Sequence, residues 1–433
     1  MIETDVLIIG AGLTGLSCAW HLERLGKPRY ILAEKNPHIG GLCASFQRGG
    51  FTFDCSGHLL HLHGDYGKKL IPALLKGNLV KIPRDARIYS HGVYTPYPFQ
   101  AATYGLPDKV VSDCVSGFLK AWLRKKEAPF DSPFDEWALS VFGEGICRHF
   151  MFPYNRKLWR VPLSALRADW CAPFVPRPDP ADVIRGAYMP QQKRFGYNAV
   201  FHYPKTGGMQ SLCDAFADGL ANGLRAESEV LSVNLRKKTA LVKNLGEVRF
   251  KRLVNTMPLK DFCGIITDAP QTIRRSAQLL KCTRVAVFNI GFSSPAKTPA
   301  HWVYFPEDKF KFYRAGLASN FAAAVAPQKS ASFYVEISGK PQAKPAALLR
   351  EISADLKNCG LVSGQAEISD SLHLEIPCAY VVYDKNRAAA VKKILEWLER
   401  GDCVSTGRYG GWKYSFMEEA ILDGRAAAEK SAA

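Results

Sequence analysis

The chain has 433 residues, which is more than one simple hydrophobic core usually holds, so we expect two interlocked domains. Apolar residues make up 47% and charged residues 22%, a balance typical of folded globular proteins that argues against disorder, collagen or a repeat array. The net charge of +17 indicates either a solubilising basic surface or a preference for anionic partners, such as phosphorylated substrates or an acidic membrane contacted peripherally. No basic-helix or zinc-finger motif favours nucleic acid.

Twelve cysteines are scattered along the chain without a Cys-x-x-Cys pair. This spacing favours reduced thiols in the cytoplasm over a disulfide framework, and it predicts no metal site. The N-terminus is acidic where a signal peptide would be basic. No run of about 18–20 apolar residues predicts a transmembrane helix.

The first 34 residues contain the strongest motif. The apolar run Val6–Ile9 predicts a buried parallel strand, and the glycines at 10, 12 and 15 open a helical pattern that ends at Gly26. A second strand, 30–33, ends at Glu34, placed to bind a ribose hydroxyl pair. This order is typical of a dinucleotide-binding βαβ unit, in which the helix N-terminus binds the pyrophosphate. The predicted contacts are Gly10, Ala11, Gly12, Thr14, Gly15, Glu34 and Lys35.

This fingerprint alone does not separate NAD from FAD, but the next residues favour FAD. A glycine pair, Gly40-Gly41, follows the acid, and a Gly-His…His segment spans residues 57–61. With these motifs the chain resembles the FAD enzymes grouped around UDP-galactopyranose mutase, protoporphyrinogen oxidase and the amine oxidases. The resemblance implies that the glycine pair and Leu42 approach the FAD pyrophosphate. It also implies that His58, Leu59 and His61 lie near the flavin ring.

The resemblance further implies an α/β fold with a discontinuous, Rossmann-like FAD-binding domain of the glutathione-reductase type. That domain would comprise residues 1–65, 203–265 and 375–433. A helical and aromatic substrate region, 66–202, and an antiparallel-sheet region, 266–374, would form an inserted mixed α+β substrate domain. Val230 and Thr256 are the expected FAD contacts of the second segment.

The C-terminal segment contains a Gly-rich strand–helix turn at 404–412, followed by a helix from residue 416. In the resembled group such a turn lies over the flavin, and the helix N-terminus stabilises negative charge on the reduced ring. The implied cofactor contacts are Gly407, Arg408, Gly411 and Trp412. Tyr414 would face both the flavin and the substrate. The mutases usually have Asp two residues later, where this chain has Phe416.

The segment 153–162 partly matches a motif with which the mutases hold uridine. Tyr154, Lys157 and Trp159 agree with that motif, whereas Asn155, Leu158 and Arg160 do not. An indole suits base stacking and nearby cations suit a diphosphate. The alternative is that the aromatic residues pack in a core. The predicted substrate contacts are Tyr154, Lys157, Trp159, Arg160, Arg167, Tyr197, Arg314 and Tyr414.

Three functions fit these patterns. The first is a non-redox isomerase of a nucleoside-diphosphate sugar that acts through N5 of reduced flavin, with NAD(P)H as a candidate external reductant. The second is an FAD-dependent oxidoreductase that removes a hydride from a C–N or C–C bond of an apolar substrate. The third is a flavin-binding scaffold or sensor without turnover. For either enzyme, the predicted catalytic residues are His58, His61, Arg408 and Tyr414.

Overall fold

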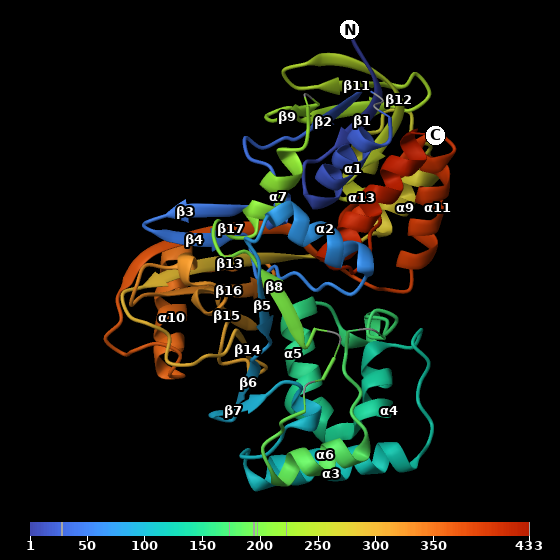
Figure 1. Ribbon diagram of the computed structural model, residues 1–433. Coiled ribbons are helices and arrows are strands. Elements are labelled where there is room, and N and C mark those ends of the chain that lie inside the picture. The colour runs from blue at the N-terminus through green and yellow to red at the C-terminus, as the bar shows by residue number, and fades with distance from the viewer. Residues whose placement is uncertain (27–28, 173, 194, 197, 222, 433) are drawn as a thin grey trace.

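The computed structural model describes residues 1–26, 29–172, 174–193, 195–196, 198–221 and 223–432. Figure 1 shows three parts: a sheet with helices around it at the top, a second sheet at the left and a helical lobe at the bottom. Both chain ends lie in the upper part, so the chain leaves this part and returns to it. Among the described residues, no helix is both long enough and apolar enough to cross a bilayer.

The upper sheet is centred on β1 (Ile2–Ile9), which pairs in parallel with β2 (Tyr30–Ala33) and β12 (Gly246–Asn255). The strand order is β10-β11-β12-β1-β2-β9. β18 (Cys403–Ser405) pairs in parallel with the last residues of β12, beyond the end of β11. The remaining strands are β9 (Leu224–Arg225), β10 (Val230–Asn234) and β11 (Thr239–Val242). The chain therefore supplies this sheet from three separate stretches.

Two helices pack closely beside β1. α1 (Leu13–Arg24) follows β1 directly, and the C-terminal α13 (Met417–Ala432) lies against it. A Cβ atom at Gly424 would lie 2.4 Å from the carbonyl oxygen of Thr14, so only glycine permits this approach. The same part contains α7 (Gln210–Ala217), α8 (Leu259–Ile265), α9 (Gln271–Leu279), α11 (Arg387–Glu399) and the short α12 (Gly407–Gly410).

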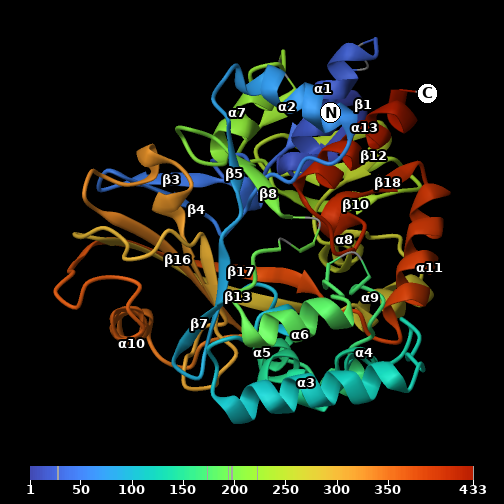
Figure 2. The same ribbon diagram turned by 60° about the horizontal axis from the view of Figure 1, so that its bottom comes forward.

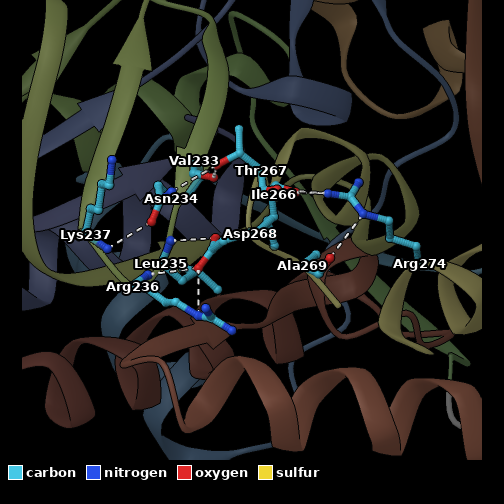
Figure 3. A network of polar contacts seen from close by, with 10 residues as sticks. All are labelled: Val233, Asn234, Leu235, Arg236, Lys237, Ile266, Thr267, Asp268, Ala269 and Arg274. Atoms are coloured by element: carbon cyan, nitrogen blue, oxygen red, sulfur yellow. Dashed lines mark hydrogen bonds and ion pairs between the residues drawn. The ribbon is translucent and has the colours of Figure 1, made fainter. Parts of the chain in front are cut away.

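A polar network ties β10 to the segment between α8 and α9 (Figure 3). The carboxylate of Asp268 accepts hydrogen bonds from the backbone N–H groups of Leu235 and Arg236, both at 3.0 Å. The guanidinium of Arg274 donates to three carbonyls of the 266–269 segment. These bonds fix the edge of the upper sheet where the chain departs for the second sheet.

The second sheet has the order β17-β13-β16-β15-β14-β6-β7. Its central strands are almost wholly buried, and one face packs against α10 (Pro345–Asn358). The region 266–374, predicted to form an antiparallel sheet, contains β13 (Cys282–Phe292), β14 (Trp302–Tyr304), β15 (Arg314–Leu317) and β16 (Ala331–Ser338). Three further strands were not predicted: β6 (Ala86–Ser90), β7 (Val93–Pro96) and β17 (Ile368–Val381). β6 and β7 lie in the region 66–202, which was predicted to be helical and aromatic.

The helical lobe is built from the middle of the chain (Figure 2). It contains α3 (Asp108–Leu123), α4 (Phe134–Ile146), α5 (Phe152–Trp159) and α6 (Pro180–Tyr188). Between the three parts lie α2 (Asp65–Leu75) and the two-stranded pairs β3 (Ser45–Arg48) with β4 (Phe51–Asp54), and β5 (Val80–Pro83) with β8 (Val200–Tyr203). β4 contacts β13 and β16 of the second sheet, whereas β5 and β8 run between the upper part and the lobe (Figure 1).

Candidate flavin and substrate site

The loop between β1 and α1 has the geometry of a phosphate-binding turn. Gly10 adopts a φ of 95°, which a side chain disfavours. A Cβ atom at Gly15 would lie 1.9 Å from the carbonyl oxygen of Gly10, so this glycine allows the helix to pack on the strand. A Cβ atom at Gly12, in contrast, would meet no atom within 4 Å. The space beside Gly12, at the start of α1, is therefore open, as an anion site at a helix N-terminus requires.

The predicted glycine pair lies directly beside this loop. The Gly40 N–H donates to the carbonyl of Ala11 at 2.8 Å, and a Cβ atom at Gly41 would lie 3.3 Å from Cα of Gly12. Both glycines have positive φ, at 103° and 56°. The backbone of Gly40 and Gly41 therefore extends the open surface around Gly12. We call this surface, which carries no side chains, the glycine cradle.

Glu34 is buried at the end of β2 and points back at the loop. Its Oε2 accepts a hydrogen bond from the Ala11 N–H at 2.8 Å. Its Oε1 accepts from both the backbone N–H and the side chain of Asn36, each at 2.9 Å. The Ser228 N–H donates to the carbonyl of Glu34, which brings the residues before Val230 alongside the acid. Lys35 is exposed.

The C-terminal turn meets the same loop from the other side. Gly407 has a φ of 82°, and a Cβ atom there would lie 2.6 Å from Oγ1 of Thr14. Thr256 holds the loop from β12, because its hydroxyl donates to the carbonyls of Ile9 and Gly10 at 2.7 and 3.1 Å. Gly407 and Thr256 are thus placed at the predicted dinucleotide site.

A cavity of about 200 Å³ opens where the upper sheet meets the second sheet and the helical lobe. All four predicted catalytic residues line it: His58, His61, Arg408 and Tyr414. Leu42, Leu59 and Arg314 also line it, as predicted for contacts of a flavin and its substrate. Half of the remaining lining residues are aromatic: Phe174, Trp302, Tyr304, Tyr313, Tyr334, Tyr380, Tyr409 and Phe416.

His58 brings a buried polar nitrogen to the cavity wall. Its Nδ1 is buried and has no hydrogen-bond partner among the described residues. Burial, together with the positive charge of Arg408, lowers the pKa of His58 to about 4. The ring is therefore neutral at physiological pH. An unpaired buried nitrogen costs free energy unless a bound group pairs with it.

Arg408 brings a positive charge to the cavity wall. Its guanidinium donates to the carbonyls of Ser415 and Ala379 and lies 4.8 Å from the ring centroid of Tyr414. Among the described residues it forms no ion pair with a carboxylate. Since carbonyls and aromatic faces do not neutralise a cation, Arg408 is suited to bind an anion in the cavity.

Arg314 also reaches the cavity, but its charge is offset. Its Nε and a terminal nitrogen donate to the two oxygens of Glu336 at 2.8 and 2.6 Å. Glu336 is itself almost fully buried and also accepts a hydrogen bond from the Ser56 hydroxyl. The ion pair therefore holds the segment just before Gly57 and His58 in place. Because Glu336 offsets its charge, Arg314 does not supply a free positive charge to the cavity.

The structure does not bring the uridine-motif residues to the cavity. Trp159 is fully buried, donates from Nε1 to Asn155 Oδ1 at 3.1 Å and packs on Trp170. Lys157 is buried and donates to the carbonyls of Phe305 and Glu307, and burial lowers its pKa to about 7. Trp159 therefore packs in the core, which was the alternative considered for the aromatic residues of this segment.

Three other predicted residues lie behind or outside the wall. Tyr154 lies behind the cavity-lining Tyr304, with ring centroids 5.4 Å apart. Arg160 is exposed at the end of α5, and Arg167 donates to the carbonyl of Asp131.

The two remaining predictions have different outcomes. Tyr197 lies outside the described residues. Trp412 is fully buried, and its carbonyl accepts two hydrogen bonds from Arg387. Its side chain therefore belongs to the core of the upper part, and only its backbone borders the C-terminal turn.

Two buried residues behind the cavity wall, Glu336 and Asn255, were not predicted from the sequence. Glu336 stands among apolar residues in the strand 331–338, and an isolated acid in such a strand is a signal that could have identified it. Asn255 is fully buried and bonds through its side chain to Ser405, joining β12 to the C-terminal turn. No sequence pattern marks Asn255.

The glycine loop, the buried acid and the adjoining cavity define a dinucleotide-type site, and the fold places the chain among the folds of FAD-dependent, amine-oxidase-like enzymes. A family model described as an NAD(P)-binding Rossmann-like domain matches residues 8–74. The solved structure of a reduced UDP-galactopyranose mutase is 25% identical to the chain, with a TM-score of 0.93. The match covers 99% of this chain and 94% of that one.

Other solved neighbours share the fold at lower identity. A protein described as a putative protoporphyrinogen oxidase from Exiguobacterium sp. 255-15 is 15% identical, with a TM-score of 0.75 and 98% of both chains covered. A putrescine oxidase variant is 13% identical, with a TM-score of 0.67 and 99% of both chains covered. These likenesses extend over almost the whole chain and show that the fold is shared.

Curated relatives match only a short stretch. An inactive all-trans-retinol 13,14-reductase of Danio rerio is 47% identical over 51 residues, 12% of this chain and 8% of that protein. The all-trans-retinol 13,14-reductase of Homo sapiens is 32% identical over 79 residues, 18% of this chain and 13% of that protein. This chain therefore aligns with a small part of these relatives' length.

Proposed function

We propose that this protein binds FAD and rearranges the sugar ring of a nucleoside-diphosphate sugar, as a mutase-type isomerase. The observation that carries this proposal is the position of Arg408. Its unpaired positive charge borders a cavity next to the open glycine cradle. The likeness to UDP-galactopyranose mutase over nearly the whole chain supports the same reaction class.

The residues of the site fit FAD. The cradle at Gly12 and Gly41 leaves room for a pyrophosphate, and Glu34 lies where a ribose would follow. The buried Nδ1 of His58 lacks a partner that a flavin edge could supply. Bound FAD would offer a nucleophilic N5 when reduced or a hydride acceptor when oxidised.

The chain's own side chains then have distinct tasks. Arg408 binds the phosphate next to the sugar, and the ring of Tyr414 beside it shields this charge pair from water. The neutral His58 provides a hydrogen-bonding nitrogen, while Glu336 and Ser56 hold its loop in place. The aromatic wall supplies faces against which a sugar ring packs.

A second candidate is an FAD-dependent oxidoreductase for an apolar or amine substrate. Three features favour it: Phe416 stands where the mutases have Asp, Trp159 is buried, and Glu336 offsets the charge of Arg314. Because of these features, the cavity offers fewer groups that could bind a nucleoside diphosphate than we would expect of a mutase.

Two assays on the FAD-loaded protein separate the candidates. We expect the dithionite-reduced protein to interconvert the pyranose and furanose forms of UDP-galactose without net oxidation, as followed by chromatography. Oxygen uptake, or bleaching of an acceptor dye, with putrescine as substrate would support the oxidoreductase instead. A protein that binds UDP but converts neither form would overturn the assignment of this sugar.

A further inference from the structure

Exposed apolar side chains are concentrated in the part of the chain that forms the helical lobe. Sixteen large apolar residues are exposed among the described residues, and eight of them lie between positions 104 and 189. That stretch makes up about a fifth of the chain, so the enrichment is more than twofold. Scattered exposed apolar residues need no explanation, but a concentration of them indicates a contact surface.

Four of these residues lie on two neighbouring helices, α3 and α6, and two lie just outside the ends of those helices. α3 and α6 lie side by side in the outermost layer of the lobe, opposite the upper sheet, in both views (Figures 1 and 2). The backbone N–H groups of Thr103 and Tyr104 donate to the carbonyl of Gly186, which joins the start of α3 to the end of α6. The six residues, which we name the lobe-end surface, are Tyr104, Trp122, Leu123, Ile184, Tyr188 and Met189, between 40% and 67% exposed.

The helices present these residues because of their spacing. On α6 the exposed positions 181, 184, 185 and 188 recur at helical intervals, while Asp182, Val183 and Gly186 face inward and are buried. On α3 the residues Val110, Cys114 and Phe118 are buried, and the helix ends with Trp122 and Leu123 turned outward. The inner faces are thus satisfied, and the outer faces are left without a partner in the described chain.

Basic residues surround the lobe-end surface. Arg124, Lys125 and Lys126 follow Leu123 directly, and all three are exposed. Lys109, Lys120 and Arg185 add three more exposed charges on the same two helices. None of these six forms an ion pair within the described residues, whereas the nearby acids Asp113 and Glu127 are paired with Arg148 and Arg177.

We propose that the lobe-end surface docks this protein onto an anionic phospholipid membrane. Trp, Tyr and Leu side chains insert at the level of the lipid headgroups, while neighbouring Lys and Arg side chains bind the lipid phosphates. A nucleic acid would use the same charges but would not need the aliphatic residues Leu123, Ile184 and Met189. The combination of bare cations and exposed aliphatic and indole groups therefore favours a lipid surface.

Vesicle co-sedimentation of the full FAD-loaded protein tests this proposal. We expect binding to vesicles that contain 30% phosphatidylglycerol and little binding to pure phosphatidylcholine vesicles. The triple change R124Q/K125Q/K126Q and the double change W122A/L123A should each reduce the partition coefficient at least about tenfold. Binding should weaken as salt is raised, because the headgroup contacts are electrostatic.

Matched controls use the opposite end of the molecule. L231A/L241A removes two apolar residues that are each 46% exposed on the upper sheet, and R236Q/K237Q removes two charges at its edge. Both control variants should bind vesicles like the parent protein. The FAD content of every variant should stay unchanged, so a failure of vesicle binding is distinguishable from a failure of the proposed flavin function.

Four outcomes would overturn the proposal. The first three are no vesicle binding, equal binding to neutral vesicles, and an equal loss of binding in the control variants. The fourth is that a single-stranded oligonucleotide displaces the protein from vesicles and that its own binding to the protein is unchanged by W122A/L123A. A concentration-dependent dimer that W122A/L123A dissociates, without any vesicle binding, would assign the surface to a second copy of the chain instead.

Discussion

Arg314 and Glu336 face each other across the neighbouring strands β15 and β16 and form a two-pronged ion pair beneath the loop that carries His58. The carboxylate also accepts the hydroxyl of Ser56, two residues before that histidine. This ion pair joins the second sheet to the cavity wall, and it gives the buried carboxylate of Glu336 a countercharge.

Replacing Glu336 with Gln should destabilise the protein by about 3–5 kcal/mol, because it leaves the guanidinium of Arg314 without its countercharge. Urea unfolding followed by circular dichroism measures this change. The double variant Arg314→Met with Glu336→Leu removes both charges and should lose less stability than the single variant. A single variant as stable as the parent would show that the pair does not hold the loop.

Arg408→Met should weaken binding of UDP to the FAD-loaded protein by at least about tenfold, since a hydrogen bond to a charged group contributes about 1.5–3 kcal/mol. Isothermal titration calorimetry measures the affinity. Arg160→Met is the matched control, because Arg160 is an exposed cation outside the cavity. Unchanged affinity in the Arg408 variant would remove this residue from the substrate site.

Acid should destabilise the flavin-free protein through its buried histidines. Burial lowers the pKa of His58 and of His61 from 6.5 to about 4. Between these pH values the unfolded chain binds more protons than the folded one, so the free energy of unfolding decreases as pH falls from about 6.5 to about 4 and levels off below.

Urea midpoints at pH 7, 5.5 and 4.5 measure this dependence on pH. The double variant His58→Asn with His61→Asn should lose less stability over the same range than the parent. Other buried histidines contribute equally to both proteins, so the difference isolates this pair. Identical slopes would mean that neither histidine is held neutral by the fold.

Trp159→Ala should lower the free energy of unfolding by about 3–5 kcal/mol, because it opens a void beside Trp170 in the core. Thermal unfolding with FAD absent and present measures the loss. A variant with parental stability and a selective loss of UDP affinity would contradict the core placement and restore the base-stacking role predicted from the motif.

The sequence predicted the part of the fold that depends on local spacing. The glycines at 10, 12 and 15, the flanking strands and Glu34 each have a backbone requirement that a single segment expresses. Strand β17 was missed because it contains Pro377 and many polar residues, and its paired residues in β13 lie 76 to 99 positions earlier. Such long-range pairing leaves no local signal.

The sequence predicted several residues that line the cavity but not the buried residues behind them, Glu336 and Asn255. His58, His61, Arg408 and Tyr414 come together at one cavity although they lie up to 356 residues apart. Trp159 shows the limit of a short motif, since Asn155 one helical turn earlier binds its indole nitrogen and keeps it in the core. The motif specifies residue types but not which face of the helix is buried.

We propose that the loop at Gly12 binds the pyrophosphate of FAD. Substitutions at two neighbouring glycines of this loop test the proposal. Gly12→Val places its side chain in open space, so the protein should fold normally yet bind FAD at least about tenfold more weakly. Gly15→Val would collide with the Gly10 carbonyl, so it should destabilise the protein itself.

The most direct measurement is titration of the purified protein with FAD, followed by flavin absorbance after gel filtration. We predict one FAD retained per chain for the parent protein and a colourless but folded Gly12→Val variant. A parent protein that stays colourless, or a Gly12→Val variant that retains FAD like the parent, would contradict the account.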